Sequence, residues 1–571
     1  MTSSMRNDVR PRRARRTAVA SAAAALVMAA PALAFQFDTP DDWSVRWDNT
    51  LKYSNAVRLK EQSARLISNA NEDDGDRNFD RGLISNRLDL FSEFDVQRQG
   101  WGARLSGAAW YDQVYNSRND NPGFQGGAFP NQTSVGYDQF TRSTRNLHGR
   151  KAEMLDWFAF GKADLGDMKA TFRLGQHAIV WGETLFFGAN GIAGGMAPAD
   201  VSKLISVPGT QFKEITRPVP QLSMQLAITP NLSVAAYYQF RYQANRLPAV
   251  GSYFSQADVN VDGAEQLLLA GPGSPFAYNA VRDADVKPRN SGQGGVRVSW
   301  RAADTDFGAY AIRFHNKSFQ QVTRLALANG FVSPGPGSYY LTYHEGIKAY
   351  GLSASHTFGS ANVAAEVSMR TNQDLSSSHA ADASALAFGA LPANDNAGNP
   401  AYAVGKTAHA NVSTLWTLDP TWLYSEAGLT AEVAWNRVLS CQKNCTVYDA
   451  ATSRGTIDPN STRDAYALRL VFEPSYRQVL PGLDVSIPVG LGYAPRGSRS
   501  RALGPGNFPP ENGGDMSIGL NGAYLGDWRF SLAYTHYFGP EKLFLDSSNS
   551  FSYGQSLKDR DFIAMSLRRT F

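Results

Sequence analysis

The sequence predicts an all-β protein: a closed, antiparallel transmembrane β-barrel of about 18 strands (16–18), with long extracellular loops and short periplasmic turns. Three observations predict this fold. Apolar and polar residues alternate in segment after segment, short and long connections alternate between those segments, and the last alternating segment runs to Phe571. Alternating segments of about ten residues match the length of a tilted strand that crosses a bilayer.

Residues 1–34 have the composition of a secretory signal peptide. Arginines precede an alanine-rich apolar stretch that ends in Ala32-Leu33-Ala34, a small-x-small pattern that signal peptidase accepts. Pro31 and the weak hydropathy of alanine disfavour the alternative, a membrane anchor. We expect cleavage before Phe35, so that residues 35–571 form the barrel. Cleavage takes Lys+Arg from 55 to 49 and Asp+Glu from 51 to 50, and a net charge near −1 argues against nucleic acid as a partner.

The segment 43–57 shows the alternation clearly. One face carries Trp43, Val45, Trp47, Leu51 and Tyr53, and the other carries Ser44, Arg46, Asp48, Thr50, Lys52 and Ser54. Successive side chains of a strand point to opposite sides, so this segment has one apolar face and one charged face.

Seventeen further segments follow the same pattern. With the first, the expected strands are 43–57, 83–97, 101–114, 152–163, 168–178, 219–229, 232–245, 292–302, 305–317, 346–358, 361–372, 404–418, 425–439, 464–476, 483–494, 515–525, 528–538 and 560–571. Eight of the connections are short turns and nine are long loops rich in Gly, Pro and Asn, which is the arrangement of an outer-membrane barrel.

The final segment explains how the barrel closes. Backbone groups in lipid must all find partners, so the last strand has to pair with the first. Ile563, Met565, Leu567 and Phe571 share one face, and a terminal aromatic after alternate apolar residues resembles the signal that outer-membrane barrels present to the barrel assembly machinery. Arg569 departs from that pattern. The rival fold, a soluble secreted all-β protein, lacks support because no blade-like repeat is present.

The sequence carries no enzyme signature, so we expect the protein not to be an enzyme. Neither H-E-x-x-H nor G-x-S-x-G occurs, and Ala403–Thr407 lacks the earlier glycine of a phosphate-binding loop. A Ser/His or Asp/His site of an outer-membrane hydrolase stays open as an alternative, because its members come from different strands. No cofactor is implied.

Charged residues on the polar faces are the candidates for the lumen lining. A wet lumen lined by both signs of charge selects permeants by charge, whereas the plainer interpretation is that these residues solvate the interior and pair with one another. The candidates are Arg46, Asp48, Lys52, Arg87, Asp89, Arg173, Arg241, Glu366, Arg370 and Arg568.

The loop Gly175–Leu204 differs from the others because it is rich in aromatic residues and glycine and poor in charge. An apolar loop of this length either folds into the barrel and narrows it or packs as an external cap. Both placements stay open. The candidates for a constriction are Trp181, Glu183, Phe186, Phe187, Met196, Asp200 and Lys203.

Two smaller features complete the candidate sites. Asp73, Asp74 and Asp76 lie in the acidic loop Asn71–Gly82 and form a weak candidate for a hard divalent ion; a solvated loop is the favoured interpretation. Cys441 and Cys445 are the two cysteines of the chain, and an exported protein would join them in a disulfide.

Long stretches of the chain resemble a known family. The segments "NEDDGDRNFDRGLISNRLDLFSEFDV", "GAAWYDQVYN" and "GQHAIVWGETLFFGANGIAGGMAPADVSKL" are similar to the proteobacterial outer-membrane barrel family catalogued as domain of unknown function 1302. The resemblance implies two proteins that act together with the barrel: a periplasmic lipid-carrier-like protein and an inner-membrane pump of the resistance-nodulation-division class. It also implies traffic in steroid-, terpenoid- or lipid-like compounds. Gly191 and Ile192 fit the family's Gly/Asn-rich stretch only loosely.

Together these features predict a porin-like channel for hydrophobic or amphipathic small molecules. It would lie in the outer membrane of a Gram-negative bacterium, in contact with outer-membrane lipids and lipopolysaccharide. Two alternatives from other classes remain: the hydrolase, and a plugged barrel that serves as a structural or binding protein.

Overall fold

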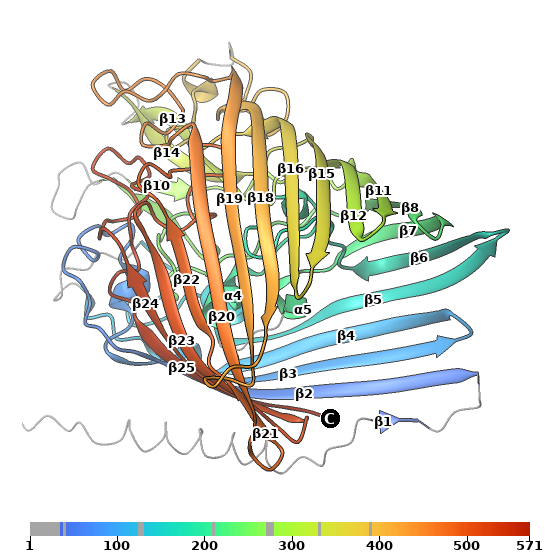
Figure 1. The fold of residues 1–571 in the computed structure, drawn as a ribbon. Helices are drawn as coiled ribbons and strands as arrows, with labels where there is room; N and C mark the ends of the chain where they lie inside the picture. Colours follow the sequence, from blue (N-terminus) through green and yellow to red (C-terminus); the bar gives the residue numbers. More distant parts are fainter. Residues whose placement is uncertain are drawn as a thin grey trace, which may run out of the picture.

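Antiparallel pairing closes eighteen strands into one barrel within the part of the chain that the computed structural model describes. The described residues are 35–37, 42–123, 131–207, 212–269, 279–328, 333–387 and 391–571, so the predicted signal peptide, residues 1–34, lies outside them. In Figure 1 the strands from β2 to β6 cross the direction of those from β15 to β20, because tilted strands on opposite walls of a barrel cross in projection.

The barrel strands follow one another in sequence order around the wall. They are β2 (Trp43–Arg58), β3 (Gly82–Arg98), β4 (Trp101–Asp112), β5 (Arg150–Leu165), β6 (Met168–His177), β7 (Val219–Thr229), β8 (Leu232–Gln239), β11 (Gln293–Ala302), β12 (Thr305–Phe314), β15 (Ile347–Phe358), β16 (Ala361–Asp374), β18 (Val404–Leu418), β19 (Glu426–Lys443), β20 (Asp464–Leu480), β21 (Leu483–Ser486) with its continuation β22 (Val489–Ala494), β23 (Gly513–Tyr524), β24 (Trp528–Phe538) and β25 (Phe562–Thr570). The short β1 (Phe35–Gln36) pairs with β2.

The seam of the barrel lies between β25 and β2. The two strands pair from Thr50 opposite Thr570 to Arg58 opposite Phe562. Beyond this ladder, the backbone N–H of Phe571 donates to the carbonyl oxygen of Asn49 over 2.8 Å, and the N–H of Asn49 donates back over 2.7 Å. The predicted closure of the last strand on the first is thereby confirmed, and the predicted fold class with it.

The loops on one side of the barrel carry the remaining secondary structure. A five-stranded sheet combines β9 (Gln266–Leu268), β10 (Asn279–Arg282), β13 (Gln320–Ala328), β14 (Ser333–Thr342) and β17 (Ala381–Asp382). The helical turns are α2 (Asp74–Arg77), η1 (Val114–Asn116), α3 (Arg142–Thr144), η3 (Arg145–Gly149), η4 (Ile192–Gly195), α4 (Val201–Ser206), α5 (Phe212–Ile215) and η5 (Ser384–Ala387). No helix in the described ranges is long and apolar enough to span a membrane.

The two faces of the sheet differ as the alternation predicts. On β19 the outward Val433 is 50% exposed, whereas its neighbour Glu432 is fully buried on the inner side. Large aromatic residues gather at the short turns, on the outer surface: Trp43, Trp101, Trp300 and Trp416 lie at strand ends, and Trp422 lies in the turn after β18. An aromatic girdle of this kind is typical of a membrane–water interface.

One strand is shorter than predicted. The segment 232–245 was expected to be a single strand, but β8 ends at Gln239. Its partner β7 begins at Val219 and carries Pro220, which has no N–H to donate to the ladder. The N–H of Tyr242 instead donates to the side-chain oxygen of Asn290, so the chain leaves the wall here.

A cysteine pair across the seam tests its register. Ser54 lies directly opposite Ser566, and opposed positions on paired strands have the spacing that a disulfide needs. We expect the double variant Ser54→Cys, Ser566→Cys to cross-link under oxidation and to migrate differently from its reduced form after boiling. The matched control, Ser54→Cys with Leu567→Cys, places the second sulfur on the other face. Cross-linking in the control alone would contradict this register.

Candidate functional site

The connection between β6 and β7 runs inside the barrel. We call residues 178–207 the inner segment. The carboxylate Oε2 of Glu432 accepts backbone N–H bonds from Leu185, Phe186 and Phe187 over 3.1, 2.5 and 3.0 Å. Glu432 faces inward from β19, since its neighbour Val433 is the exposed one. Of the two placements that the sequence left open, the structure therefore shows the one inside the barrel.

A second carboxylate holds the inner segment against β16. Glu366 accepts the N–H of Glu183 over 2.8 Å with one oxygen and that of Ile192 over 2.6 Å with the other. Further along the same strand and on the same face, the guanidinium of Arg370 donates to the carbonyl oxygens of residues 189–191 over 2.8–3.0 Å. Glu366 and Arg370 were predicted to line a lumen, and both lie on the inner face; they act there as anchors of the inner segment.

Asn190 is the most fully bonded side chain of the inner segment. Its amide nitrogen donates to Asn411 Oδ1 over 2.9 Å and to the carbonyl oxygens of two neighbouring strand residues. Its amide oxygen accepts from Asn436 over 3.0 Å and lies 3.0 Å from the ring nitrogen of His409. All four side chains are buried, so this network fixes the position of the inner segment.

Aromatic and aliphatic side chains attach the inner segment to the neighbouring strands β8, β12 and β15. The ring of Trp181 lies edge-on to Tyr237 at 5.1 Å and near Tyr310 at 6.5 Å, centroid to centroid. Ile192 and Met196 are buried in the same cluster, which also contains residues of β12 and β15. The inner segment therefore contacts a continuous run of the wall, from β8 to β19.

An apolar surface lies beside a charged pair where the inner segment faces β20 and β23. Phe187 packs against Phe508 at 5.3 Å, and the guanidinium carbon of Arg469 stands 5.8 Å from the ring centre of Phe186. Arg469 also pairs with Asp515 through two bonds of 3.1 and 3.0 Å. A ring and a charge of each sign thus meet within one contact region.

The last two constriction candidates form an ion cluster with the wall. Asp200 pairs with Arg246 over 2.8 Å, and Arg246 pairs with Glu153 of β5 over 2.7 Å. Lys203 lies 3.6 Å from Glu153 and 4.6 Å from the ring centre of Trp110. Burial lowers the pKa of Lys203, which the two acidic neighbours oppose. This cluster docks α4 onto β4 and β5 and leaves no charge of the four without an opposite partner.

The predicted lumen residues of β2 and β3 lie on the inner face and form pairs. Arg46 contacts Asp48 at 2.8 Å, and Arg87 contacts Asp89 at 2.7 Å. Lys52 stands directly opposite Asp89 in the strand register. The plainer interpretation, in which such residues solvate the interior and pair with each other, describes these five: the pairs form within one strand or between adjacent strands.

The three remaining lumen candidates lie in different surroundings. Arg173 lies over the ring of Phe158 at 5.6 Å. Arg568 stands opposite Lys52 on one side and opposite Arg529 on the other, so three cations cross the seam in one row. Arg241 was expected on the inner face of a strand, and that is wrong: it lies beyond the end of β8 and is exposed.

The acidic loop between β2 and β3 is buried, so the expected solvated loop is wrong. Glu72, Asp73, Asp74 and Asp76 are all enclosed. The physical reason is the loop that follows β8, which packs on top: a side chain on Gly75 would place its Cβ 2.5 Å from the Ser255 carbonyl oxygen.

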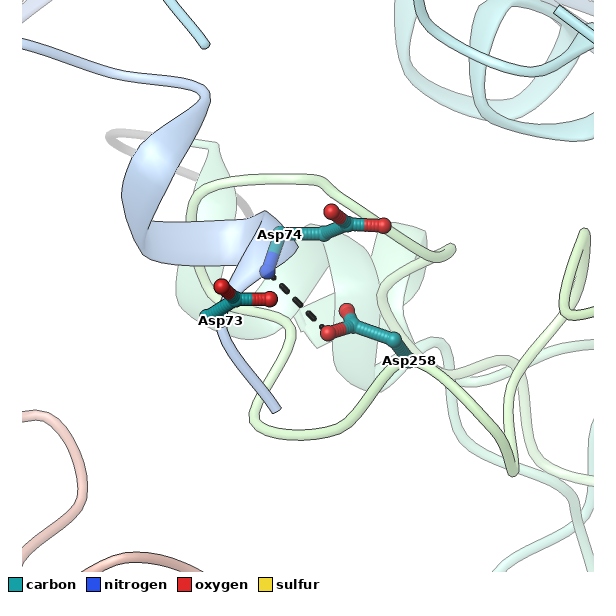
Figure 2. Close-up of side chains that lie close together, drawn as sticks. All are labelled: Asp73, Asp74 and Asp258. Carbon is teal, nitrogen blue, oxygen red and sulfur yellow. Dashed lines mark hydrogen bonds between the residues drawn. The ribbon is translucent and has the colours of Figure 1, made fainter. Parts of the chain in front are cut away.

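Asp73, Asp74 and Asp258 form the acidic cluster of the structure, in place of the predicted Asp73, Asp74 and Asp76. Asp76 pairs with Arg58 over 2.6 Å and takes no part in it. Asp258, from the loop after β8, joins Asp73 and Asp74 instead, and ligand oxygens of the three approach within 4.8 Å of one another (Figure 2). Burial raises the pKa of Asp73 to about 6 and that of Asp74 to about 7. It raises the pKa of Asp258 well above its ordinary value.

The cysteines and two of the histidines concern the predicted disulfide and the alternative of a Ser/His site. Cys441 and Cys445 form the predicted disulfide. Within the described ranges, His177 lies 2.9 Å from Ser223 Oγ and His379 lies 2.8 Å from Ser378 Oγ. In both pairs a backbone carbonyl oxygen, where a triad has a carboxylate, contacts the second ring nitrogen.

Sequence reasoning missed three residues that organise the interior. Glu432 sits at an inward position of β19 next to small Ala434, so the alternation alone marks it as a lumen residue. Asn190 has no signal beyond its place in the unusual loop. Asp258 has none, since it is 184 residues from Asp74.

The anchoring role of Glu432 is testable by hydrogen exchange. Glu432→Ala removes the acceptor of three backbone N–H groups, and each hydrogen bond to a charged group is worth about 1.5–3 kcal/mol. We expect amide exchange in residues 185–187 to speed up by about tenfold or more, measured by mass spectrometry in detergent. Glu473→Ala, which removes another inner-wall carboxylate that bonds Ser486, is the control and should leave those amides protected. Equal exchange in both variants would contradict the assignment.

Several solved outer-membrane proteins share a loose likeness with the chain. OccAB3 of Acinetobacter baumannii is 10% identical at a TM-score of 0.42, with 92% of this chain and 99% of that chain covered. OccAB2 of the same organism is 9% identical at 0.42, with 93% and 98% covered. The outer membrane protein opdK of Pseudomonas aeruginosa is 10% identical at 0.40, with 92% and 98% covered. Likeness at this level supports no statement about function. No curated protein matches the chain.

Nearly the whole chain matches the profile of one protein family. The match spans residues 15–571, and the family is described as a protein of unknown function, DUF1302. The resemblance seen in the acidic loop and the inner segment is thereby confirmed over the full length of the barrel. The chain belongs to the DUF1302 family.

Proposed function

We propose that this protein is a porin-like channel for hydrophobic or amphipathic small molecules. The observation that carries the proposal is the inner segment, which narrows the interior of a closed barrel and is fixed there by Glu366 and Glu432. A loop that served only as a cap would not need two buried carboxylates on the barrel wall as anchors. A fixed constriction inside a wide barrel selects solutes by size and chemistry.

The chemistry of the constriction favours solutes with an apolar body and one polar group. Leu185 is 39% exposed although the inner segment lies within the barrel, so an apolar side chain faces the enclosed space. It is followed by the ring of Phe186, with Arg469 above that ring and Asp515 beside the guanidinium. The ring and the leucine would contact the body of a steroid-, terpenoid- or lipid-like solute, and the charged pair would orient its polar end.

The cellular setting is proposed on the family resemblance. Export through a signal peptide cleaved before Phe35 would bring the chain to the outer membrane, where the aromatic girdle fits the lipid interface. Coupling to a periplasmic lipid-carrier-like protein and an inner-membrane pump of the resistance-nodulation-division class would give the passage a direction. A plugged structural barrel is the alternative, and conductance separates the two.

Single-channel conductance tests the constriction. Replacing Phe186–Met196 by a Gly-Ser linker of four residues removes the anchored part of the inner segment. We expect conductance in a planar bilayer to rise severalfold, because the constriction sets the resistance of the pore. The control replaces residues 446–456, in the loop after β19, by the same linker and should conduct like the parent. An unchanged conductance after the first replacement would contradict the proposal, and a parent without conductance would favour the plugged barrel.

Charge selectivity tests the orienting role of Arg469. Two exposed charges at contact distance interact with an energy of about 1 kcal/mol, which corresponds to a change of about fivefold in the rate of permeation. In liposome swelling we expect Arg469→Ala to lower the permeation of an aromatic carboxylate relative to a neutral aromatic alcohol of the same size. Asp515→Asn removes the opposite charge and should raise the same ratio. A shift in one direction for both variants, or none in either, would overturn this role.

A further inference from the structure

The acidic cluster on the extracellular side has too few positive partners for its charge. Asp73, Asp74 and Asp258 are all buried. Arg77 pairs with Asp73, and no ion pair to Asp74 or Asp258 is found within the described residues. Arg560 is also buried and attracts Asp258, but it forms no ion pair with it and attracts Asp559 as well. The three aspartates and Arg77 by themselves carry a formal charge of −2. A buried carboxylate without a cation is costly, because it loses its hydration and gains nothing in return.

Unsatisfied oxygens converge on the same place. Asp73 Oδ1 and Asp258 Oδ1 are buried and have no hydrogen-bond partner. Gln132, which is more than nine-tenths buried, donates from its amide nitrogen to the Asp258 carbonyl oxygen over 3.2 Å and also bonds the Asp74 carboxylate. Its amide oxygen has no partner either. Figure 2 shows Asp73 and Asp74 on one chain segment and Asp258 on a facing segment, with the N–H of Asp74 bonded to the Asp258 carboxylate.

We propose that Asp73, Asp74 and Asp258, with the amide oxygen of Gln132, bind one calcium ion. The donor set consists of oxygen atoms alone, which a hard divalent cation prefers, and calcium accepts irregular arrangements of carboxylate and amide oxygens that magnesium does not. A charge of +2 would neutralise the cluster.

The site would join three loops that lie far apart in the sequence. Asp73 and Asp74 belong to the loop after β2, Asp258 to the loop after β8, and Gln132 to the loop after β4. The loops already touch, since the N–H of Asp74 donates to Asp258 Oδ2 over 3.0 Å. Calcium would therefore fasten the extracellular loops at the mouth of the barrel, and extracellular calcium sites of this kind bind at about 10⁻⁴–10⁻³ M. The inference stands apart from the proposed transport function.

Calcium binding is testable on the whole protein, refolded into detergent so that lipopolysaccharide is absent. After treatment with a chelator, we expect isothermal titration to give one calcium ion per chain and the Tm to rise with calcium. In the sterically matched variant Asp74→Asn, Asp258→Asn, both effects should vanish. Its Tm in chelator should equal or exceed that of the parent, because two buried charges are gone. The control Asp138→Asn, Asp285→Asn alters two aspartates that pair with Arg118 and Arg282 and should bind calcium like the parent.

The outcomes separate the proposal from a structural role of the cluster. If the Tm of the parent changes with pH but does not change with calcium up to about 10 mM, the carboxylates bind protons and not calcium, and the proposal fails. It fails as well if the double variant binds calcium like the parent. Should the double variant not fold, Asp74→Asn alone decides: we expect its calcium affinity to fall at least tenfold, and an unchanged affinity would overturn the assignment.

Discussion

The requirement that every backbone N–H and C=O in lipid find a partner governs this structure. A sheet meets that requirement only when it closes, and here closure depends on the ladder between β2 and β25, extended by the bonds between Asn49 and Phe571. Closure then fixes everything else. It separates an outer face for lipid from an inner face for water, and it forces the long connections to one end. Any segment that enters the interior must find hydrogen-bond partners for its backbone there.

The inner segment meets that second demand with side chains from the wall. Glu366 and Glu432 accept five backbone N–H bonds between them, and Arg370 donates to backbone carbonyl oxygens of the inner segment. In the opposite sense, Asn190 of the inner segment donates to backbone carbonyl oxygens of the wall. A loop without regular structure has unsatisfied backbone groups, and buried charged side chains take the place of a strand partner. The charges on the inner face thus hold a loop as well as contact solvent, which is why so few of the predicted lumen residues are free of partners.

The barrel strands could be predicted from sequence because each strand has its own local pattern. The arrangement of the interior could not, because it depends on contacts between residues that lie far apart in the sequence. Seventeen of the eighteen strands were placed within a few residues because the period-two alternation and the turn chemistry lie inside each segment. The predicted end of β8 was wrong, because Pro220 on the neighbouring strand has no N–H to continue the ladder. The unusual composition of the inner segment marked it as special. Its placement depends on Glu366 and Glu432, more than 170 residues away, which no local pattern connects to it. The acidic cluster likewise needed Asp258, which the loops bring to Asp74 only on folding.

The placement of Leu185 in an open lumen is the central claim, and thiol modification during conduction tests it most directly. Both native cysteines are paired, so Leu185→Cys adds the single free thiol. A charged thiol reagent added to the open channel is predicted to lower the single-channel current in discrete steps, whereas Val433→Cys on the lipid face should give none. A current through Leu185→Cys that the reagent leaves unchanged, with the thiol shown to be unreacted, would contradict the account.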